Sequence, residues 1–231
     1  MRLNRFLALR GIATRRDVDK MIESGRVYLN GQVAKLGDRV AHADENIEIH
    51  EARFRENKEL RYVAYYKPRG IITHTPQAGE QDIQAVSGYP DLSPLGRLDK
   101  DSEGLIILTN DGRVTERLLH PRFEHEKEYI VSVNGKVTGR VRDTLLRGVL
   151  SEGEKLSAKK VDILDPATLS IILTEGKKHQ VRRMLEAADL HVTRLVRVRI
   201  MNIHLGKLQP GQARELLGPA RKSFLRDLGL K

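Results

Sequence analysis

Four acidic residues lie close together between residues 95 and 112, in a chain of 231 residues whose formal net charge is +10. The segment reads LGRLDKDSEGLIILTNDG, and its acids are Asp99, Asp101, Glu103 and Asp111. The order D-x-D-x-E-G matches the first half of a calcium-binding loop. A single carboxylate between an arginine and an apolar strand would instead be typical of an enzyme that uses one acid. The two interpretations imply different proteins.

Spacing argues against a metal site in this segment. A calcium loop needs a bidentate Glu at its twelfth position, and counting from Asp99 that position is Asn110. A metal-dependent nuclease would need its acids on one side of a strand, whereas these acids lie around a turn. We expect residues 101–104 to form this turn and Asp111 to belong to the next one. Asp99 is then either a turn acid paired with Arg97 or a catalytic carboxylate.

A basic helix is the second candidate feature. In TEGKKHQVRRMLEAA, a buried helical stripe is predicted at Val181, Met184, Leu185 and Ala188, and Arg182 and Arg183 lie off this stripe. Three cations, Lys177, Lys178 and His179, precede the helix and oppose its dipole, so an anion such as an RNA phosphate would relieve the conflict. An ordinary basic surface helix would also explain the pattern.

Two strand segments carry further candidates. Period-two alternation in LVRVRI predicts a core face with Val196, Val198 and Ile200 and an opposite face with Leu195, Arg197 and Arg199. A leucine beside two arginines is unexpected on a plain solvent face, although strand ends often show it. In HEKEYIVSV, Tyr129 begins a strand, where a tyrosine is more often a core residue than a catalytic one.

The composition limits the chemistry available. With 41 Lys and Arg against 31 Asp and Glu, the surface should attract polyanions, and nucleic acid before membrane. The absence of Cys excludes zinc–thiolate sites and thiol nucleophiles. No run approaches the roughly 18 apolar residues of a membrane helix, and the N-terminus lacks a cleavable signal pattern. We therefore expect a cytoplasmic protein.

The elements that must position these residues divide into two units. Residues 1–50 contain a helix that stops at Gly11, a second helix that Thr14 can cap, and a hairpin at Asn30-Gly31. The charged stretch 51–60 suits an exposed linker. In the second unit, 61–231, strands are predicted at 62–66, 71–73, 104–108, 129–133, 170–173 and 195–200, and helices at 114–119, 141–146 and 180–188. The fold class is therefore α+β, with a small sheet in the first unit and a larger mixed sheet in the second.

The basic residues of the first unit have two explanations. Charge runs are commonly just a solvated helix face. However, RLNRFLALRGIATRRDVDKMIESGRVYLNGQVAKLGDRV closely resembles the S4 RNA-binding domain. The resemblance implies RNA-phosphate contacts from Arg2, Arg5, Arg15, Arg16, Lys20 and Arg26.

The candidate motifs of the second unit resemble those of pseudouridine synthases. GRLDKDSEGLIILTNDG is similar to the signature in which the acid at Asp99 is the single catalytic carboxylate, and EGKKHQVRRM to the motif whose arginine, here Arg182, pairs with that acid. HEKEY resembles the K-x-Y motif, which implies that Tyr129 stacks on the uracil and is the candidate base for the C5 proton. Together with YYKPRGIITHT, the resemblance implies a substrate-binding set of Arg97, Leu195, Lys177, Lys178, His179, Gln180 and Lys67. In this set Leu195 packs against the target base and Arg97 fills the space of a flipped base.

Taken together, the motifs resemble the bacterial S4-bearing ribosomal RNA pseudouridine synthases. This implies isomerisation of one uridine without cofactor or metal, with Asp99 attacking C1′ or acting through a glycal route. RIMN, with Met201 where many members have glycine, favours large-subunit (23S) ribosomal RNA over 16S ribosomal RNA or tRNA, and Asp189 is a second departure from a common glycine. We expect a monomer that acts on free RNA or on an assembling subunit. The rival from another class is a non-catalytic RNA-binding ribosome assembly factor.

Overall fold

The computed structural model describes residues 1–10, 12–13, 15–41, 45–50 and 59–230. In the first unit, α1 (Leu3–Leu9) and α2 (Arg15–Glu23) pack on a small antiparallel sheet in the order β2-β1-β3, formed by Gln32–Val33, Val27–Leu29 and Ile47–Ile49. The apolar face of each helix is buried, as its spacing predicted, in a core that includes Leu3, Leu7, Val18, Met21 and Ile22. The helix end expected at Gly11, the cap expected from Thr14 and most of the expected linker, 51–58, lie outside the described residues.

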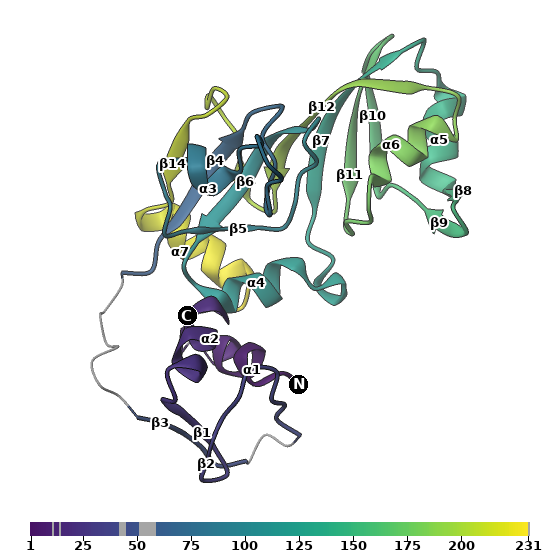
Figure 1. Cartoon of the computed structure of the whole chain (residues 1–231). Helices are drawn as coiled ribbons and strands as arrows, with labels where there is room; N and C mark the ends of the chain where they lie inside the picture. The colour runs from purple at the N-terminus through teal and green to yellow at the C-terminus, as the bar shows by residue number, and fades with distance from the viewer. Residues whose placement is uncertain (11, 14, 42–44, 51–58, 231) are drawn as a thin grey trace.

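A mixed sheet in the order β10-β11-β7-β12-β6-β4-β14 forms the second unit (Figure 1). Its strands are β4 (Tyr62–Lys67), β6 (Glu103–Thr109), β7 (Lys127–Asn134), β10 (Lys160–Asp165), β11 (Thr168–Leu173), β12 (His191–Ile200) and β14 (Ala213–Glu215). Strand β5 (Ser93–Leu95) pairs with β6, β13 (Ile203–His204) pairs with β12, and β8 (Val149–Ser151) forms a separate hairpin with β9 (Glu154–Leu156). Because β12 runs parallel to β6 and antiparallel to β7, the sheet is mixed, and the predicted α+β class is confirmed.

Two apolar cores lie on the two halves of this sheet, beneath the helices that flank each half in Figure 1. On the half with β4 and β6, α4 (Gly112–Leu119) and α7 (Gly218–Asp227) bury Val114 and Phe224. On the half with β7 and β11, α5 (Gly139–Arg147) and α6 (Gln180–Glu186) bury Leu145 and Met184. The short α3 (Ile83–Val86) covers the other face of β4 and β6. The two halves meet where β6 pairs with β12, and this seam positions the candidate site.

Two expectations about the ends of the second unit need correction. The strand predicted at 71–73 is wrong, because Ile72 forms only an isolated bridge with Asp82, between two loops. The sequence predicted no helix in the C-terminal segment, but α7 forms there and is part of the core. Phe224 of α7 is fully buried, and its ring meets the edge of Tyr62 with the ring centroids 6.2 Å apart.

The two positions where glycine is common in the resembled family keep a glycine-like backbone. Asp189 has φ 58° and Met201 has φ 50°, both in the left-handed region that a side chain disfavours. Asp189 and Met201 therefore keep, at these two positions, the left-handed backbone that a glycine adopts readily.

The first unit contacts the second through α1 and α4. A Cβ on Gly112, the first residue of α4, would lie 3.3 Å from the Ala8 carbonyl oxygen, so the small residue permits the close approach. Arg5 also forms an ion pair with Glu116 of α4 at 2.8 Å. Within the described part of the chain, every helix is too short or too polar to cross a membrane.

Candidate active site

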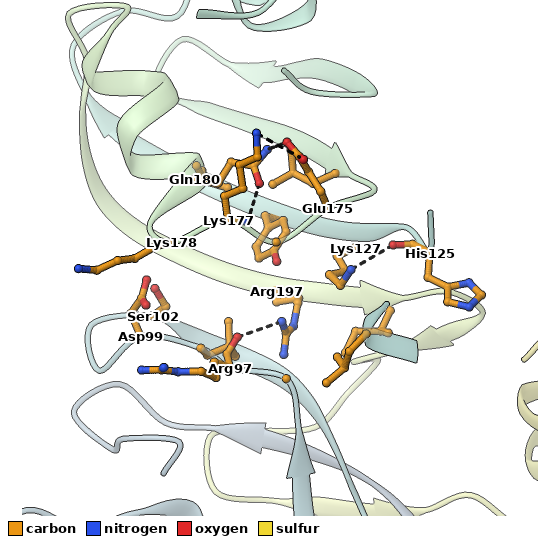
Figure 2. A pocket seen from close by; sticks show the side chains of 18 of the residues that line it. Arg97, Asp99, Ser102, His125, Lys127, Glu175, Lys177, Lys178, Gln180 and Arg197 are labelled. Atoms are coloured by element: carbon orange, nitrogen blue, oxygen red, sulfur yellow. Dashed lines mark hydrogen bonds and ion pairs between the residues drawn. The ribbon is translucent and has the colours of Figure 1, made fainter. Parts of the chain in front are cut away.

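A cavity of about 570 Å³ lies at the seam between the two halves of the sheet (Figure 2). Its walls come from the loop before β6, the end of α4, the start of β7, the loop before α6 and the end of β12. A volume in this range is typical of small-molecule sites. The cavity brings together every predicted catalytic and substrate-binding residue except Lys67 and Arg182, namely Arg97, Asp99, Tyr129, Lys177, Lys178, His179, Gln180 and Leu195.

Asp99 lies on a loop whose backbone is fixed on both sides. Before it, the Thr73 hydroxyl accepts from the Leu98 N–H at 3.0 Å and donates to the Leu98 carbonyl at 2.7 Å. After it, the Ser102 N–H donates to the Asp99 carbonyl at 3.0 Å and closes a turn. The Asp99 side chain is 38% exposed. The carboxylate is therefore accessible but held on a rigid backbone, as a reacting group requires.

Lys67 lies beneath this turn rather than in the cavity. It is fully buried, and its ammonium donates to the carbonyls of Pro68 at 2.9 Å and Ser102 at 2.7 Å. Burial lowers the pKa of Lys67 to about 8, against the raising effect of the Asp99 charge. The predicted substrate-binding role is corrected, because a residue with no exposed surface supports the turn and supplies positive charge from below.

The acids that follow Asp99 serve β6 and its neighbours. Glu103, expected in the turn, is the first residue of β6 and accepts from the Tyr66 hydroxyl at 2.8 Å and from Arg194 at 2.7 Å. Burial opposes ionisation of Glu103, but these donors hold its pKa below the ordinary value. Asp101 is 72% exposed and points to Arg69 at 4.0 Å. These acids therefore point to different partners, which removes the basis of a shared metal site.

Gly104 has a geometric role in the same motif. It pairs with Arg197 of β12, and its φ is 110°. A Cβ at this position would lie 2.4 Å from the Arg197 carbonyl oxygen, a separation that side chains do not tolerate. Glycine is therefore needed for the close approach of β6 and β12 that joins the two halves of the sheet.

His179 is the predicted residue that faces the Asp99 carboxylate. It precedes α6 in the left-handed conformation, with φ 51°, and its Nε2 lies 3.5 Å from Asp99 Oδ1. The predicted Arg182–Asp99 ion pair is not formed among the described residues. Arg182 lies nearly one turn further along α6, where its guanidinium donates to the Asp101 carbonyl at 3.2 Å. Arg182 thus holds the turn after Asp99, and His179 takes the place expected for the cation.

The loop between β11 and α6 is held by its own polar side chains. Gln180 is 3% exposed, accepts from the Lys177 N–H at 3.0 Å and donates to Glu175 at 2.8 Å. Lys177 donates to the Lys155 carbonyl at 3.1 Å, and Arg183 donates to the Lys178 carbonyl at 3.3 Å. This network fixes the loop that presents His179 and leaves Lys178 as an exposed cation on the cavity wall.

The base of the cavity is formed by β7 and β12. Tyr129 of β7 is paired in register with Arg197 of β12, and both line the cavity with Leu195. The predicted faces hold for Leu195 and Arg197, and Ile200 is buried in the same core as Val196, as predicted. The prediction is wrong for Arg199, because a bulge between Arg197 and Arg199 shifts the register. Ile200 also lines the cavity. Arg199 lies on the other face, where it pairs with Glu128 at 2.8 Å and Glu126 at 3.0 Å.

Comparisons with known proteins identify the family. A family described as RNA pseudouridylate synthase matches residues 61–187, and the S4 domain family matches residues 1–46. The dual-specificity RNA pseudouridine synthase RluF of Escherichia coli is 38% identical over 221 residues, which cover 94% of this chain and 75% of that protein. An uncharacterized RNA pseudouridine synthase of Aquifex aeolicus is 35% identical and covers 100% of this chain. The chain belongs to the RNA pseudouridine synthase family.

A solved structure agrees with this membership. A crystal structure of a pseudouridylate synthase superposes with a TM-score of 0.71 at 29% sequence identity and covers 99% of both chains. The chain is therefore an S4-containing RNA pseudouridine synthase, an isomerase that acts within one nucleotide. This outcome rules against the non-catalytic assembly factor that the sequence left open.

Two further cations line the synthase cavity, and neither was assigned a role from the sequence: Lys127, the lysine of the K-x-Y motif, and Arg197. Lys127 lies two residues before Tyr129 on β7, and period two predicts that both side chains share a face. Arg197 had been placed on the correct face but without a role. It is 3% exposed, and its Nε donates to the Leu105 carbonyl at 2.7 Å. The strand alternation around Tyr129 contained the signal for Lys127.

The basic residues of the S4 unit have varied surroundings. Arg2, Arg15 and Lys20 are exposed, and Arg26 donates to the Ser24 hydroxyl at 2.8 Å. Arg5, in contrast, is paired with Glu116 of the catalytic unit, so its predicted phosphate contact would compete with a contact between the two units. The side chain of Arg16 lies outside the described structure. Phosphate contacts from the exposed members remain a prediction.

Proposed function

We propose that this synthase converts one uridine of ribosomal RNA, in the large subunit, to pseudouridine, with Asp99 as its catalytic carboxylate. The observation that carries the proposal is the placement of Asp99 in a cavity shared with Tyr129 and Leu195 and bordered by Lys178 and His179. This arrangement offers a nucleophile, two apolar surfaces for a planar base and cations for the RNA backbone.

The chemistry follows from these positions. Asp99 either attacks the ribose C1′ or acts through a glycal after loss of the 2′ proton. The uracil is released, turns within the cavity and rejoins through C5, after which the C5 proton leaves with Tyr129 as the candidate base. The Asp99 carboxylate faces His179 Nε2 at 3.5 Å, and the Lys67 ammonium lies beneath the turn that follows Asp99. Arg182 contributes by holding the carbonyl of Asp101.

Access to the cavity requires the target nucleotide to leave its stack. A uridine inside a helix cannot reach Asp99, so flipping would cost a few kcal/mol. Arg97, which is exposed and lines the cavity, is the candidate for filling the vacated space. Exposed cations of the S4 unit and of the loop before α6 would hold the RNA through phosphate contacts that weaken as salt increases. On this proposal the substrate is ribosomal RNA, either free or in an assembling subunit, and the enzyme acts in the cytoplasm. We also propose that it acts as a monomer.

A second substrate is compatible with one comparison, and tRNA is the candidate that the sequence left open. The RluF relatives carry the description dual-specificity. The same cavity could serve two RNAs if each presents a flipped uridine in a similar fold. Small-subunit ribosomal RNA is the remaining alternative.

Mapping pseudouridines by sequencing in cells that lack the protein tests the proposal. We expect one or a few pseudouridines to disappear from 23S ribosomal RNA, and to return when wild-type protein is supplied but not Asp99→Asn. Loss of a site in tRNA alone would move the substrate, and restoration by Asp99→Asn would overturn the role of Asp99. An unchanged pattern in both RNAs would contradict the proposed substrates.

A further inference from the structure

Two cations, the buried Arg197 and the half-buried Lys127, converge at the end of the cavity away from Asp99. Lys127 comes from β7 and Arg197 from β12, and both line the cavity. The Lys127 ammonium donates to the His125 carbonyl at 3.2 Å, and Arg197 donates to the carbonyls of Leu105 at 2.7 Å and Arg97 at 3.4 Å. In Figure 2, Arg197 and Lys127 lie to one side of Asp99. These backbone partners neutralise neither charge.

The carboxylates near this end are engaged elsewhere. Glu126 and Glu128, which flank Lys127 along β7, bind Arg199 on the opposite face of the strand. On the cavity wall, Asp99 faces His179, and Glu175 accepts from Gln180. The part of the chain that the structure describes thus brings no carboxylate into contact with the two cations.

Arg197 also retains an unused donor. Its second terminal nitrogen is buried and has no hydrogen-bond partner among the described residues, although the residue is only 3% exposed. A buried unpaired donor is costly, and a buried cation more so. Burial lowers the pKa of Lys127 to about 8, and the nearby Arg197 charge acts in the same direction. The arrangement is unfavourable in the free enzyme and would become favourable when an electron-rich group enters the cavity.

The geometry of β7 indicates which part of a nucleotide reaches these cations. Tyr129 shares the face of Lys127 and is paired in register with Arg197. On the proposed function, C1′ lies at Asp99 and the uracil lies over Tyr129. The carbonyl edge of the base then points away from Asp99, toward the Lys127–Arg197 end of the cavity.

We propose that Lys127 and Arg197 bind the uracil carbonyl oxygens and stabilise the negative charge that the base acquires when it leaves the ribose. Cleavage of the C1′–N1 bond sends the electron pair to N1, and the charge spreads to O2 and O4. C1′ is meanwhile captured by an Asp99 oxygen, or the ribose loses its 2′ proton to give the glycal. C5 of the base anion then bonds to C1′ and displaces the Asp99 oxygen, or adds to the glycal while the 2′ proton returns to C2′, so the charge of the base is used in the new bond. Loss of the C5 proton and gain of a proton at N1 then give neutral pseudouridine. Donors in a low-dielectric site stabilise such developing charge most strongly.

The same pair provides discrimination between bases. Uracil presents an acceptor at O4, whereas cytosine presents an amino donor at that position. If cytosine entered the cavity, its amino group would face the donors of Lys127 and Arg197, and none of these donors would find an acceptor. A mismatch of this kind excludes a substrate strongly. Lys127 and Arg197 are therefore assigned to base recognition as well as to leaving-group stabilisation. This inference rests on the proposed function.

The test varies the acidity of the uracil base, which is the leaving group of the first step. Single-turnover loss of the N1-linked nucleoside is measured on two target RNAs, one with uridine and one with 5-fluorouridine at the modified position. Fluorine stabilises the base anion, so it reduces the need for the cations. For Lys127→Met we expect a loss of about 10²-fold on uridine RNA but a loss of under about tenfold on 5-fluorouridine RNA, with RNA affinity within about threefold of wild type. Lys160→Met, which removes an exposed lysine paired with Asp162 on β10, is the matched control.

The other outcomes are distinguishable. Equal losses on the two RNAs would show that Lys127 only positions the substrate, and a weakened affinity with an unchanged rate would make this end of the cavity a phosphate site. Either result overturns the proposal, as does wild-type behaviour of Lys127→Met. Arg197→Gln, with its fold checked by circular dichroism, should likewise lose less of its rate on the 5-fluorouridine RNA than on the uridine RNA. Failure of the wild-type enzyme on all ribosomal and transfer RNAs would instead reject the proposed function.

Discussion

The two ends of the cavity differ in the kind of structure that holds their charges. At the Asp99 end, the acid and His179 lie on loops, and their side chains are 38% and 47% exposed. At the other end, Lys127 and Arg197 lie on adjacent strands, and Arg197 is 3% exposed. One end is open and can contact RNA, whereas the other is enclosed by the sheet.

This difference matches two chemical needs. A carboxylate that must meet a ribose at the edge of an RNA strand needs access, and its charge is supported by cations around and beneath it. A base that becomes anionic needs a site with little water, where each donor acts more strongly. The seam between the two halves of the sheet supplies both environments within a single cavity.

Removing the support beneath Asp99 should have a large effect, second to that of replacing Asp99 itself. In Lys67→Met, the turn carbonyl of Ser102 loses its donor and Asp99 loses a nearby positive charge. We expect kcat to fall by roughly 10²-fold while RNA affinity stays unchanged, measured by single-turnover kinetics and filter binding. Lys100→Met, which removes an exposed lysine paired with Glu80 near the same turn, is the control. A Lys67→Met rate within threefold of wild type would show that the turn holds Asp99 without this cation.

The pH dependence should reveal the buried Lys67 and the half-buried Lys127. Burial lowers the pKa of Lys67 and of Lys127 to about 8. The Arg197 charge lowers the pKa of both lysines, whereas Asp99 and Glu103 raise the pKa of Lys67. Both roles need the charged form, so the single-turnover rate should fall as pH rises through 8, by up to about tenfold per pH unit for each group.

Stability should change in the opposite direction over the same range. Between pH 8 and about 10 the unfolded chain binds more protons than the folded protein at these lysines, so the free energy of unfolding should increase with pH. Denaturant titrations of wild type and Lys127→Met would measure the slope, which should be smaller in the variant. An identical slope would mean that Lys127 titrates alike in both states.

A smaller effect is expected from the open end. The His179–Asp99 pair is 3.5 Å long and about half exposed, and exposed pairs of this kind contribute up to about 1 kcal/mol, or roughly fivefold. His179→Gln should therefore slow the reaction by about fivefold or less. Lys178→Gln, on the same loop, should weaken RNA binding and leave the rate of bound RNA unchanged. A loss of 10²-fold in His179→Gln would make this residue as important as the buried cations and would remove the contrast between the two ends.

The contact between the two units should have the smallest effect. Arg5 and Glu116 are 45% and 24% exposed, so Arg5→Ala should cost under about 1 kcal/mol in stability. RNA affinity should change by less than about threefold. The exchanged pair Arg5→Glu with Glu116→Arg should restore stability. A large loss of RNA affinity in both variants would show that Arg5 binds phosphate rather than pairing only with Glu116 of α4.

The sequence predicted the parts of the site that depend on local pattern. Asp99, Tyr129 and Leu195 were identified from motifs, and the strand carrying Tyr129 was correct because alternation determines its faces. The errors came from long-range geometry. The bulge after Arg197 placed Arg199 on the face opposite to the predicted one, and burial of Lys67 depends on the turn before β6, whose Ser102 carbonyl accepts from its ammonium. The core position of α7 was not predicted, because its apolar pattern is short and the contact of Phe224 with Tyr62 joins residues far apart in the sequence.

The most direct test of the account is the release of the C5 hydrogen. Unmodified 23S, 16S and transfer RNAs carrying tritium at C5 of uridine are incubated with the purified protein, without added metal or nucleotide, and tritium in water is counted with pseudouridine formed. We predict equal amounts of both from the wild type, and for Asp99→Asn bound RNA with at least a 10³-fold lower rate. Release by Asp99→Asn within tenfold of wild type would contradict the account.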